Sequence, residues 1–461
     1  MRELRVLACA GLTHGHGFPV ESFEAGLAKN PDYIACDSGS SDPGAYYLGS
    51  GEPMARRAGT KTYLRILMLA ALKHKVPLVI GSCGTAGAEP HLQWFADIAR
   101  EIAREDVLHF KLALVHAEQS KDYVKGKLRE GRIRPLDNTP PLTEGDVDRA
   151  DHIVGMMGTE PIIKAVEQGG QIVLLGRSSD SAMFAAIPMM KGYPAGLAWH
   201  MAKIVECGGM ASEPIPGAGP TSRGGDSMFA YLRDDHFLLE PTHPGKRCTP
   251  VRVAAHTLYE NASPYHLYEP SGMIDTTTSR YEQHDPRTAK ISGTGFVPTK
   301  QYTIKLEGAE KVGYRTIFIG ATRDPGLISQ IDSYLANVNK IVENRTERLG
   351  IPRNEYRLVW RTYGKNGVMG EIEPDPSPPK EICLISEAVA RDQETANVVM
   401  AFAHTYALHS NFEGQLCTAG NMAIPYSPHD IPTGPVYRFN IWHLVEPTDP
   451  YEMFPVEMAS T

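Results

Sequence analysis

Short apolar runs alternate with amphipathic stretches along the first half of the chain. The apolar runs predict buried strands at residues 6–10, 33–36, 78–80, 111–116, 151–153 and 172–175. Apolar positions at helical spacing between these runs predict helices at residues 23–28, 60–73, 89–105, 159–167 and 181–190. Such alternation is typical of the α/β class, so we expect a mostly parallel sheet with helices on both faces.

The second half of the chain has a different pattern. Strands are expected at residues 302–306, 314–320, 356–361 and 381–390, and helices at residues 327–342 and 394–409. This order indicates an α+β domain. Stretches rich in Gly, Pro and Ser at residues 213–226 and 241–250 favour a boundary between them, so we expect domains at residues 1–245 and 246–461. A proline-rich segment near 374–379 indicates a boundary within the second domain.

Three of the predicted strands lead into polar turns that contain glycine. The turns are Asp37–Gly44, Gly81–Gly87 and Gly176–Asp180. Parallel strands end at the same edge of a sheet, where ligands of α/β proteins bind. Backbone N–H groups and hydroxyls in such turns favour a small anionic ligand. The expected binding residues in these turns are Ser40, Ser41, Asp42, Gly81, Ser82, Gly84, Arg177 and Asp180.

Two places in the sequence are candidates for acid–base chemistry. Asp37 directly follows a predicted strand, so its carboxylate could transfer a proton or, with Asp42, hold a divalent metal. The residue types also fit a turn that satisfies its own backbone. His256 and Glu260 are four residues apart, so on a helix they share a face and form a general base with an orienting carboxylate. Helix capping and surface pairing are the alternative for these two residues.

Several further polar residues were considered for ligand binding. Arg177 could clamp a substrate carboxylate, whereas Asp180 also fits a helix cap. Arg247 begins a dense polar cluster, and Asn421 lies in a late polar loop that is expected to face the first domain across a cleft, so both are candidate binding residues. His200 and Glu206 are six residues apart on a predicted helix and do not share a face, so they make a poor metal pair; either could be a lone base, but structural roles are favoured.

Composition narrows the class of protein. The net charge of −8 has no basic runs, which argues against nucleic acid as a partner. No apolar stretch is long enough to span a membrane as a helix, and no export signal is evident. We therefore expect a cytoplasmic protein whose seven cysteines are reduced thiols. The Gly81 turn lacks the lysine of a phosphate-binding loop, and no nucleotide fingerprint is present, so the cofactor is unknown and a divalent metal stays open.

Seven segments together resemble the acyclic terpene utilisation AtuA family of bacterial catabolic proteins. They are Asp37–Gly44, Tyr47–Gly51, Gly155–Gly158, Gly176–Asp180, Cys248–Pro250, Ala255–Asn261 and Cys417–Asn421. The resemblance implies a cytoplasmic protein of acyclic terpenoid or related carboxylate and acyl-CoA breakdown. Many relatives carry an additional small C-terminal domain that is not evident before Thr461, so a small partner subunit is expected to supply it. A homo-oligomer is also compatible with the sequence.

Abundant carboxylates and histidines without a redox fingerprint favour a lyase or hydratase that acts on a branched carboxylate or acyl-CoA. In this hypothesis Asp37 or His256 is the base, while Arg177 and the Gly81 turn hold the anion. Two alternatives remain open at this point. One is a hydrolase that uses a Cys or Ser nucleophile from the turns, and the other is a non-catalytic ligand-binding subunit of a catabolic complex.

Overall fold

The computed structural model describes residues 2–12, 15–218, 225–375 and 377–461 and contains two compact units. The larger unit comprises residues 1–310 and 439–461, and the smaller unit comprises residues 311–438. The division falls inside two long strands, β17 (Ile304–Thr322) and β20 (Ile431–Val445). The units differ from the expected domains. Residue 245 lies well inside the larger unit, because residues on both sides of it in the sequence form strands of the same main sheet.

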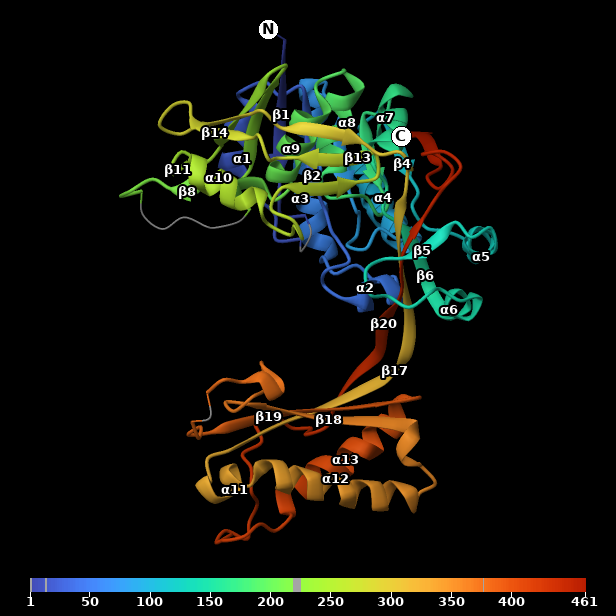
Figure 1. Cartoon of the computed structure of the whole chain (residues 1–461), viewed down its shortest axis with the longest axis vertical. Coiled ribbons are helices and arrows are strands. Elements are labelled where there is room, and N and C mark those ends of the chain that lie inside the picture. The colour runs from blue at the N-terminus through green and yellow to red at the C-terminus, as the bar shows by residue number, and fades with distance from the viewer. Residues whose placement is uncertain (1, 13–14, 219–224, 376) are drawn as a thin grey trace. The chain divides into compact units, whose positions relative to one another are not determined.

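Five parallel strands form the centre of the main sheet in the larger unit (Figure 1). In spatial order they are β1 (Glu3–Cys9), β2 (Tyr33–Asp37), β3 (Leu78–Gly81), β7 (Ile172–Leu175) and β4 (Lys111–Val115). Each of the four neighbouring pairs is parallel. The parallel sheet expected for the N-terminal half is therefore confirmed.

Antiparallel strands that the sequence pattern did not predict extend this sheet at both edges. Beyond β1 lie β9 (Met228–Arg233), β10 (His236–Pro241), β15 (Ala289–Ser292) and β14 (Arg280–Gln283). Beyond β4 lies β21 (Val456–Ser460), from the end of the chain. Residues 228–292 thus continue the first sheet, which is why no domain boundary falls near 245.

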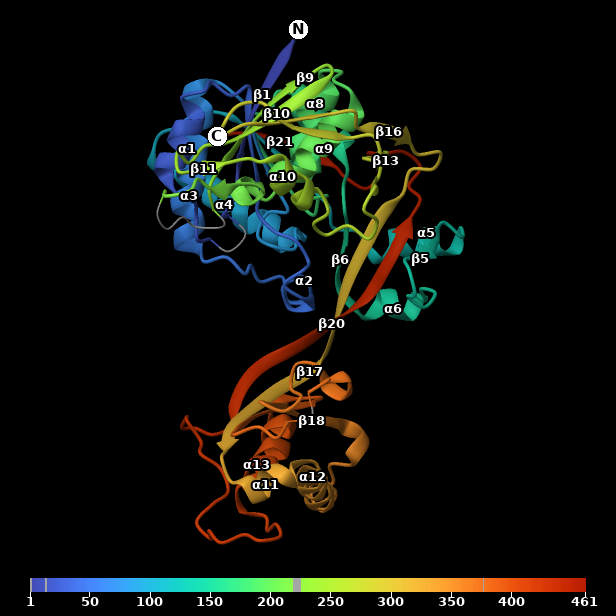
Figure 2. The ribbon, with the colours of Figure 1, turned by 60° about the vertical axis from the view of Figure 1, so that its left-hand side comes forward.

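Helices cover both faces of the sheet, as Figure 2 shows. Along β1, Val6 and Ala8 enter one hydrophobic core, whereas Leu7 and Cys9 enter the other. The first core contains α7 (Thr159–Glu167), α8 (Ala182–Met190) and α9 (Ala195–Val205). The second contains α1 (Val20–Leu27), α3 (Arg57–His74) and α4 (Glu89–Glu105).

Shorter elements surround these layers. The helices are α2 (Ala45–Ser50), α5 (Lys121–Arg129), α6 (Glu144–Arg149) and α10 (Pro250–Thr257). The strands are β5 (Ile133–Pro135), β6 (Ala150–Gly155), β8 (Glu213–Pro214), β11 (Lys246–Arg247), β12 (His266–Glu269), β13 (Gly272–Asp275) and β16 (Gly295–Pro298). The strand expected near residues 151–153 exists as β6, but it pairs antiparallel with β17 instead of joining the parallel sheet.

The smaller unit is the expected α+β region. Its elements follow in the order β17, α11 (Pro325–Ser329), α12 (Ile331–Glu347), β18 (Tyr356–Tyr363), β19 (Ile382–Ala390), α13 (Gln393–His409) and β20. The strands are arranged β18-β19-β17-β20, and α12 and α13 pack on one face through every second residue of β19. The segment near 374–379 connects β18 to β19 within this unit; residue 376 lies outside the described residues.

No helix among the described residues is long and apolar enough to cross a membrane.

Candidate active site

A cavity of about 1000 Å³ lies in the larger unit at the carboxyl ends of the parallel strands. Three strand-end loops line it, those that follow β1, β2 and β7, together with residues just after α9 and α10. The polar and aromatic lining residues are His16, Phe18, Asp37, Ser40, Asp42, Tyr63, Asp180, Glu206, Cys207, Tyr259 and Glu260. The edge of the sheet chosen from the sequence is therefore hollowed.

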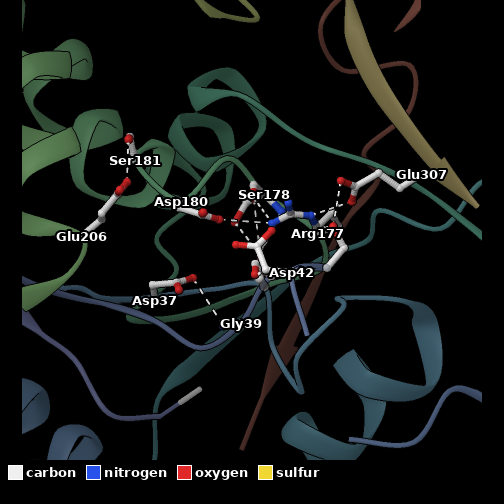
Figure 3. Close-up of polar contacts among 12 residues, drawn as sticks. Asp37, Gly39, Asp42, Arg177, Ser178, Asp180, Ser181, Glu206 and Glu307 are labelled. Carbon is white, nitrogen blue, oxygen red and sulfur yellow. Dashed lines mark hydrogen bonds and ion pairs between the residues drawn. The ribbon is translucent and has the colours of Figure 1, made fainter. Parts of the chain in front are cut away.

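Three carboxyl groups from separate elements come together in this cavity (Figure 3). Asp37 is the last residue of β2, Asp180 stands just before α8, and Glu206 follows α9 directly. The carboxyl of Asp37 accepts a hydrogen bond from the backbone N–H of Gly39 at 3.4 Å. The charges of Asp180 and Glu206 both act on Asp37, so the three groups form one electrostatic cluster.

Burial of this cluster raises the pKa of each of its carboxyl groups. Burial raises the pKa of Asp37 well above its usual range, and the nearby charge of Asp180 raises it further. Burial likewise raises the pKa of Asp180. The pKa of Glu206 rises to about 7, again mainly through burial, although Lys203 opposes the shift. A carboxyl group with a pKa near 7, such as that of Glu206, exchanges protons near neutral pH, as general acids and bases do.

Lys203 and Ser181 hold the Glu206 carboxyl in place. Lys203 Nζ lies 2.5 Å from Glu206 Oε1 and 3.4 Å from Glu260 Oε2. The hydroxyl of Ser181 donates to Glu206 Oε2 at 2.9 Å. Because Lys203 is about one turn before Glu206, the last turn of α9 places its ammonium beside the Glu206 carboxyl.

Arg177 is buried, is paired with carboxyl groups of the protein itself and does not line the cavity. Its Nε donates to the buried Glu307 at 2.8 Å, and its Nη1 lies 3.1 Å from Asp180 Oδ1. Glu307 also accepts from Lys305 at 2.7 Å and from the hydroxyl of Ser41 at 2.9 Å. The guanidinium expected to clamp a substrate therefore positions Asp180 instead.

The loop after β3 packs against the loops that follow β2 and β7, and none of its residues lines the cavity. Gly81, Ser82 and Gly84 are buried, and none of them lines the cavity. A Cβ atom on Gly39 would lie 2.2 Å from the carbonyl oxygen of Thr85, and one on Gly87 would lie 2.2 Å from the backbone nitrogen of Arg177. These glycines thus allow the turns to approach closely, which accounts for their presence without an anion.

The expected helical pair of His256 and Glu260 is not formed. Helix α10 ends at Thr257, and Glu260 adopts φ = 60°, so the two residues are not on one helical face. Glu260 lines the cavity and pairs with Lys203, whereas His256 is buried, stacks on Tyr259 and is not part of the lining. Helix α10 ends before it reaches Glu260, and a four-residue spacing alone does not show where a helix ends.

Arg247 and Asn421 lie outside the cavity. Arg247 pairs with Glu213 at 2.9 Å across the short β8–β11 ladder. Asn421 belongs to the smaller unit, where its side-chain amide donates to the carbonyl of Ser410 and to the hydroxyl of Tyr334, both at 2.7 Å. Both contacts stabilise loops locally.

The carboxyl and thiol side chains also bear on metal binding and nucleophilic chemistry. Among the described residues, no group of three or more His, Cys, Asp or Glu side chains is arranged to hold a metal ion. Burial raises the pKa values of Cys83, Cys207 and Cys248, which disfavours the nucleophilic thiolate form. Of these cysteines, Cys207 lines the cavity.

The charge of the cavity differs from the anion site expected from the sequence. Its described lining includes the carboxyl groups of Asp37, Asp42, Asp180, Glu206 and Glu260 but no lysine or arginine. Such a lining favours a neutral, hydrogen-bonding part of a ligand over an anionic part. For Glu206 the sequence favours a structural role over that of a lone base. Its place in the cavity depends on where α9 ends, one residue before it, which spacing along the sequence does not reveal.

Comparison with known protein families identifies the family of the chain. No curated protein and no solved structure matches the chain significantly. The profile of the acyclic terpene utilisation family protein AtuA matches residues 5–427, which include every residue of the carboxyl cluster. The chain therefore belongs to the AtuA family, which is implicated in acyclic terpene utilisation.

Proposed function

We propose that this protein is a cytoplasmic catabolic enzyme, a lyase or hydratase that acts on a branched, acyclic-terpenoid type of carboxylate or acyl-CoA. The observation that carries the proposal is the cluster of Asp37, Asp180 and Glu206, three carboxyl groups with raised pKa values, of which that of Glu206 is about 7 and suits proton transfer near neutral pH. Membership of a family named for acyclic terpene use supports the substrate class.

In the proposed reaction, water adds across a carbon–carbon double bond, or leaves in the reverse direction. A carboxylate takes one proton from water while the water oxygen bonds to one carbon of the double bond. A protonated carboxyl donates a proton to the other carbon. Asp37 and Glu206 fill these two roles, since both face the cavity from separate walls. The acidic lining would hold the neutral double bond or alcohol and would direct the substrate's anionic end outward.

The first experiment identifies a substrate and then removes the proposed proton carrier. Branched alkenoic acids and their CoA thioesters are screened by thermal shift, because a ligand of the folded state raises Tm. With a bound compound, incorporation of solvent deuterium is followed by NMR. Asp37→Asn is expected to slow incorporation about a hundredfold or more. Asp42→Asn is the matched control, because Asp42 lines the same cavity but is exposed, and it should retain most activity.

The pH dependence gives a second test. Lys203 lowers the pKa of Glu206, so Lys203→Met should move the limb of the pH–rate profile near pH 7 to higher pH. An unchanged limb would remove Glu206 from the mechanism. Full activity of Asp37→Asn combined with inactivation by alkylation of Cys207 would favour the hydrolase, and tight binding without turnover would favour a ligand-binding subunit.

A further inference from the structure

A second cavity in the larger unit has the opposite charge. It measures about 660 Å³ and lies against the small sheet of β12, β13 and β16, with further walls from β5 and from the ends of β17 and β20 that belong to this unit. Its described lining includes three basic side chains, Arg134, Lys300 and Lys305, and one acidic side chain, Glu269. The volume is within the range of small-molecule sites.

The walls of this cavity are mainly apolar. Met156, Met273, Val297 and Leu444 contribute aliphatic surface. Tyr268 and Val297, at its rim, are 76% and 50% exposed, although both are large apolar residues. Exposed apolar side chains gathered around a concave surface are typical of a ligand site.

The basic side chains are placed to meet an anion. Arg134 and Lys300 are exposed, and neither forms an ion pair with another described residue. Lys305 is held by Glu307 at 2.7 Å and by the ring of Trp442, 4.3 Å from its centroid. Burial raises the pKa of Glu269 to about 8, so this carboxyl is largely neutral at pH 7 and does not cancel the positive charge.

We propose that this cavity is a second ligand site, which binds an aliphatic carboxylate with its chain against the apolar walls and its carboxylate at Arg134 and Lys300. The site goes beyond the proposed function, since none of its lining residues lines the acidic cavity. The chemistry of recognition is a charge-assisted contact to the carboxylate together with burial of the chain.

Binding of octanoate to the full chain, measured by isothermal titration at low salt, tests the proposal. Octanoate should bind more tightly than octanol or octylammonium, and acetate should not compete, because both the chain and the negative charge are required. The double variant Arg134→Ala/Lys300→Ala should weaken octanoate binding about tenfold and leave octanol binding unchanged. Lys73→Ala/Arg104→Ala removes two exposed charges elsewhere on the same unit and should change neither.

A matched pair of cavity-filling variants locates the bound chain. Met273→Trp fills the basic cavity and should abolish octanoate binding, whereas Met210→Trp fills the acidic cavity and should preserve it. Octylammonium binding as tight as octanoate, or loss of binding in Met210→Trp alone, would overturn the proposal. Because the readout is binding and not turnover, retained octanoate binding in an inactive Asp37→Asn variant separates this proposal from the proposed function.

Discussion

The buried ion pair between Arg177 and Glu307 allows a quantitative prediction. Glu307 is completely buried, and burial alone would raise its pKa, yet Arg177 and then Lys305 hold that pKa at about 2 instead of 4.5. A shift of this size corresponds to about 3 kcal/mol of stability at neutral pH. Removal of one partner from a buried ion pair typically costs about 3–5 kcal/mol. We therefore expect Arg177→Met to destabilise the larger unit by about 3 kcal/mol at pH 7.5.

The assay is urea unfolding followed by tryptophan fluorescence in a Trp360→Phe background. This background is chosen because Trp360 lies in the smaller unit, whereas Trp94, Trp199 and Trp442 lie in the larger one. Replacement of both partners, in Arg177→Met with Glu307→Gln, should recover at least about 1 kcal/mol relative to Arg177→Met alone, because the fully buried Glu307 charge is no longer left without Arg177. A loss below about 1 kcal/mol in the single variant, or no recovery in the double variant, would refute the reasoning.

Two further predictions concern packing and buried histidine. Gly39→Ala should destabilise the larger unit strongly because its Cβ would meet the Thr85 backbone, whereas Gly126→Ala, inside α5 with open space around it, should stabilise by about 0.5–1 kcal/mol in the same urea assay. His200 lies between the hydroxyls of Thr294 and Thr257, and burial lowers its pKa to about 3. It folds neutral, so wild-type stability should fall by about 2 kcal/mol relative to His200→Gln between pH 6.5 and 5, and parallel pH profiles would contradict this.

The centre of the fold was predictable from local patterns, and the edges were not. The periodicity of Leu92, Phe95, Ile98 and Ile102 marked α4 at its observed bounds, because an amphipathic helix carries its burial in its own sequence. The antiparallel strands at both sheet edges escaped prediction. Strand β21, for example, is defined by its pairing with β4, more than 300 residues away, and a local pattern contains no sign of such a partner.

The candidate site divides in a similar way. Asp37 and Asp180 could be placed at the edge of the sheet because Asp37 ends one strand and Asp180 lies in the loop after another, and the α/β pattern implies the direction of both strands. The partners that determine charge could not be placed. Glu307, whose carboxylate pairs with Arg177, belongs to β17, 130 residues further along the chain. The sequence pattern therefore pointed to the edge of the sheet where the cavity lies but not to the charge of its lining, since an arginine after a strand looks free until its distant carboxylate is known.

The raised pKa of Asp37 leads to a prediction about how stability depends on pH. A carboxyl whose pKa is higher in the folded state contributes stability that is fully present below the unfolded pKa of about 4 and is lost as pH rises from there through the folded pKa. Asparagine at this position cannot ionise, so Asp37→Asn should gain stability relative to the wild type as pH rises above about 4, measured as the urea midpoint. If the Asp37 carboxyl ionised as readily in the folded protein as in the unfolded chain, the difference between the two proteins would not depend on pH. A variant that is more stable and yet inactive would show that the cluster is maintained for chemistry at the expense of stability.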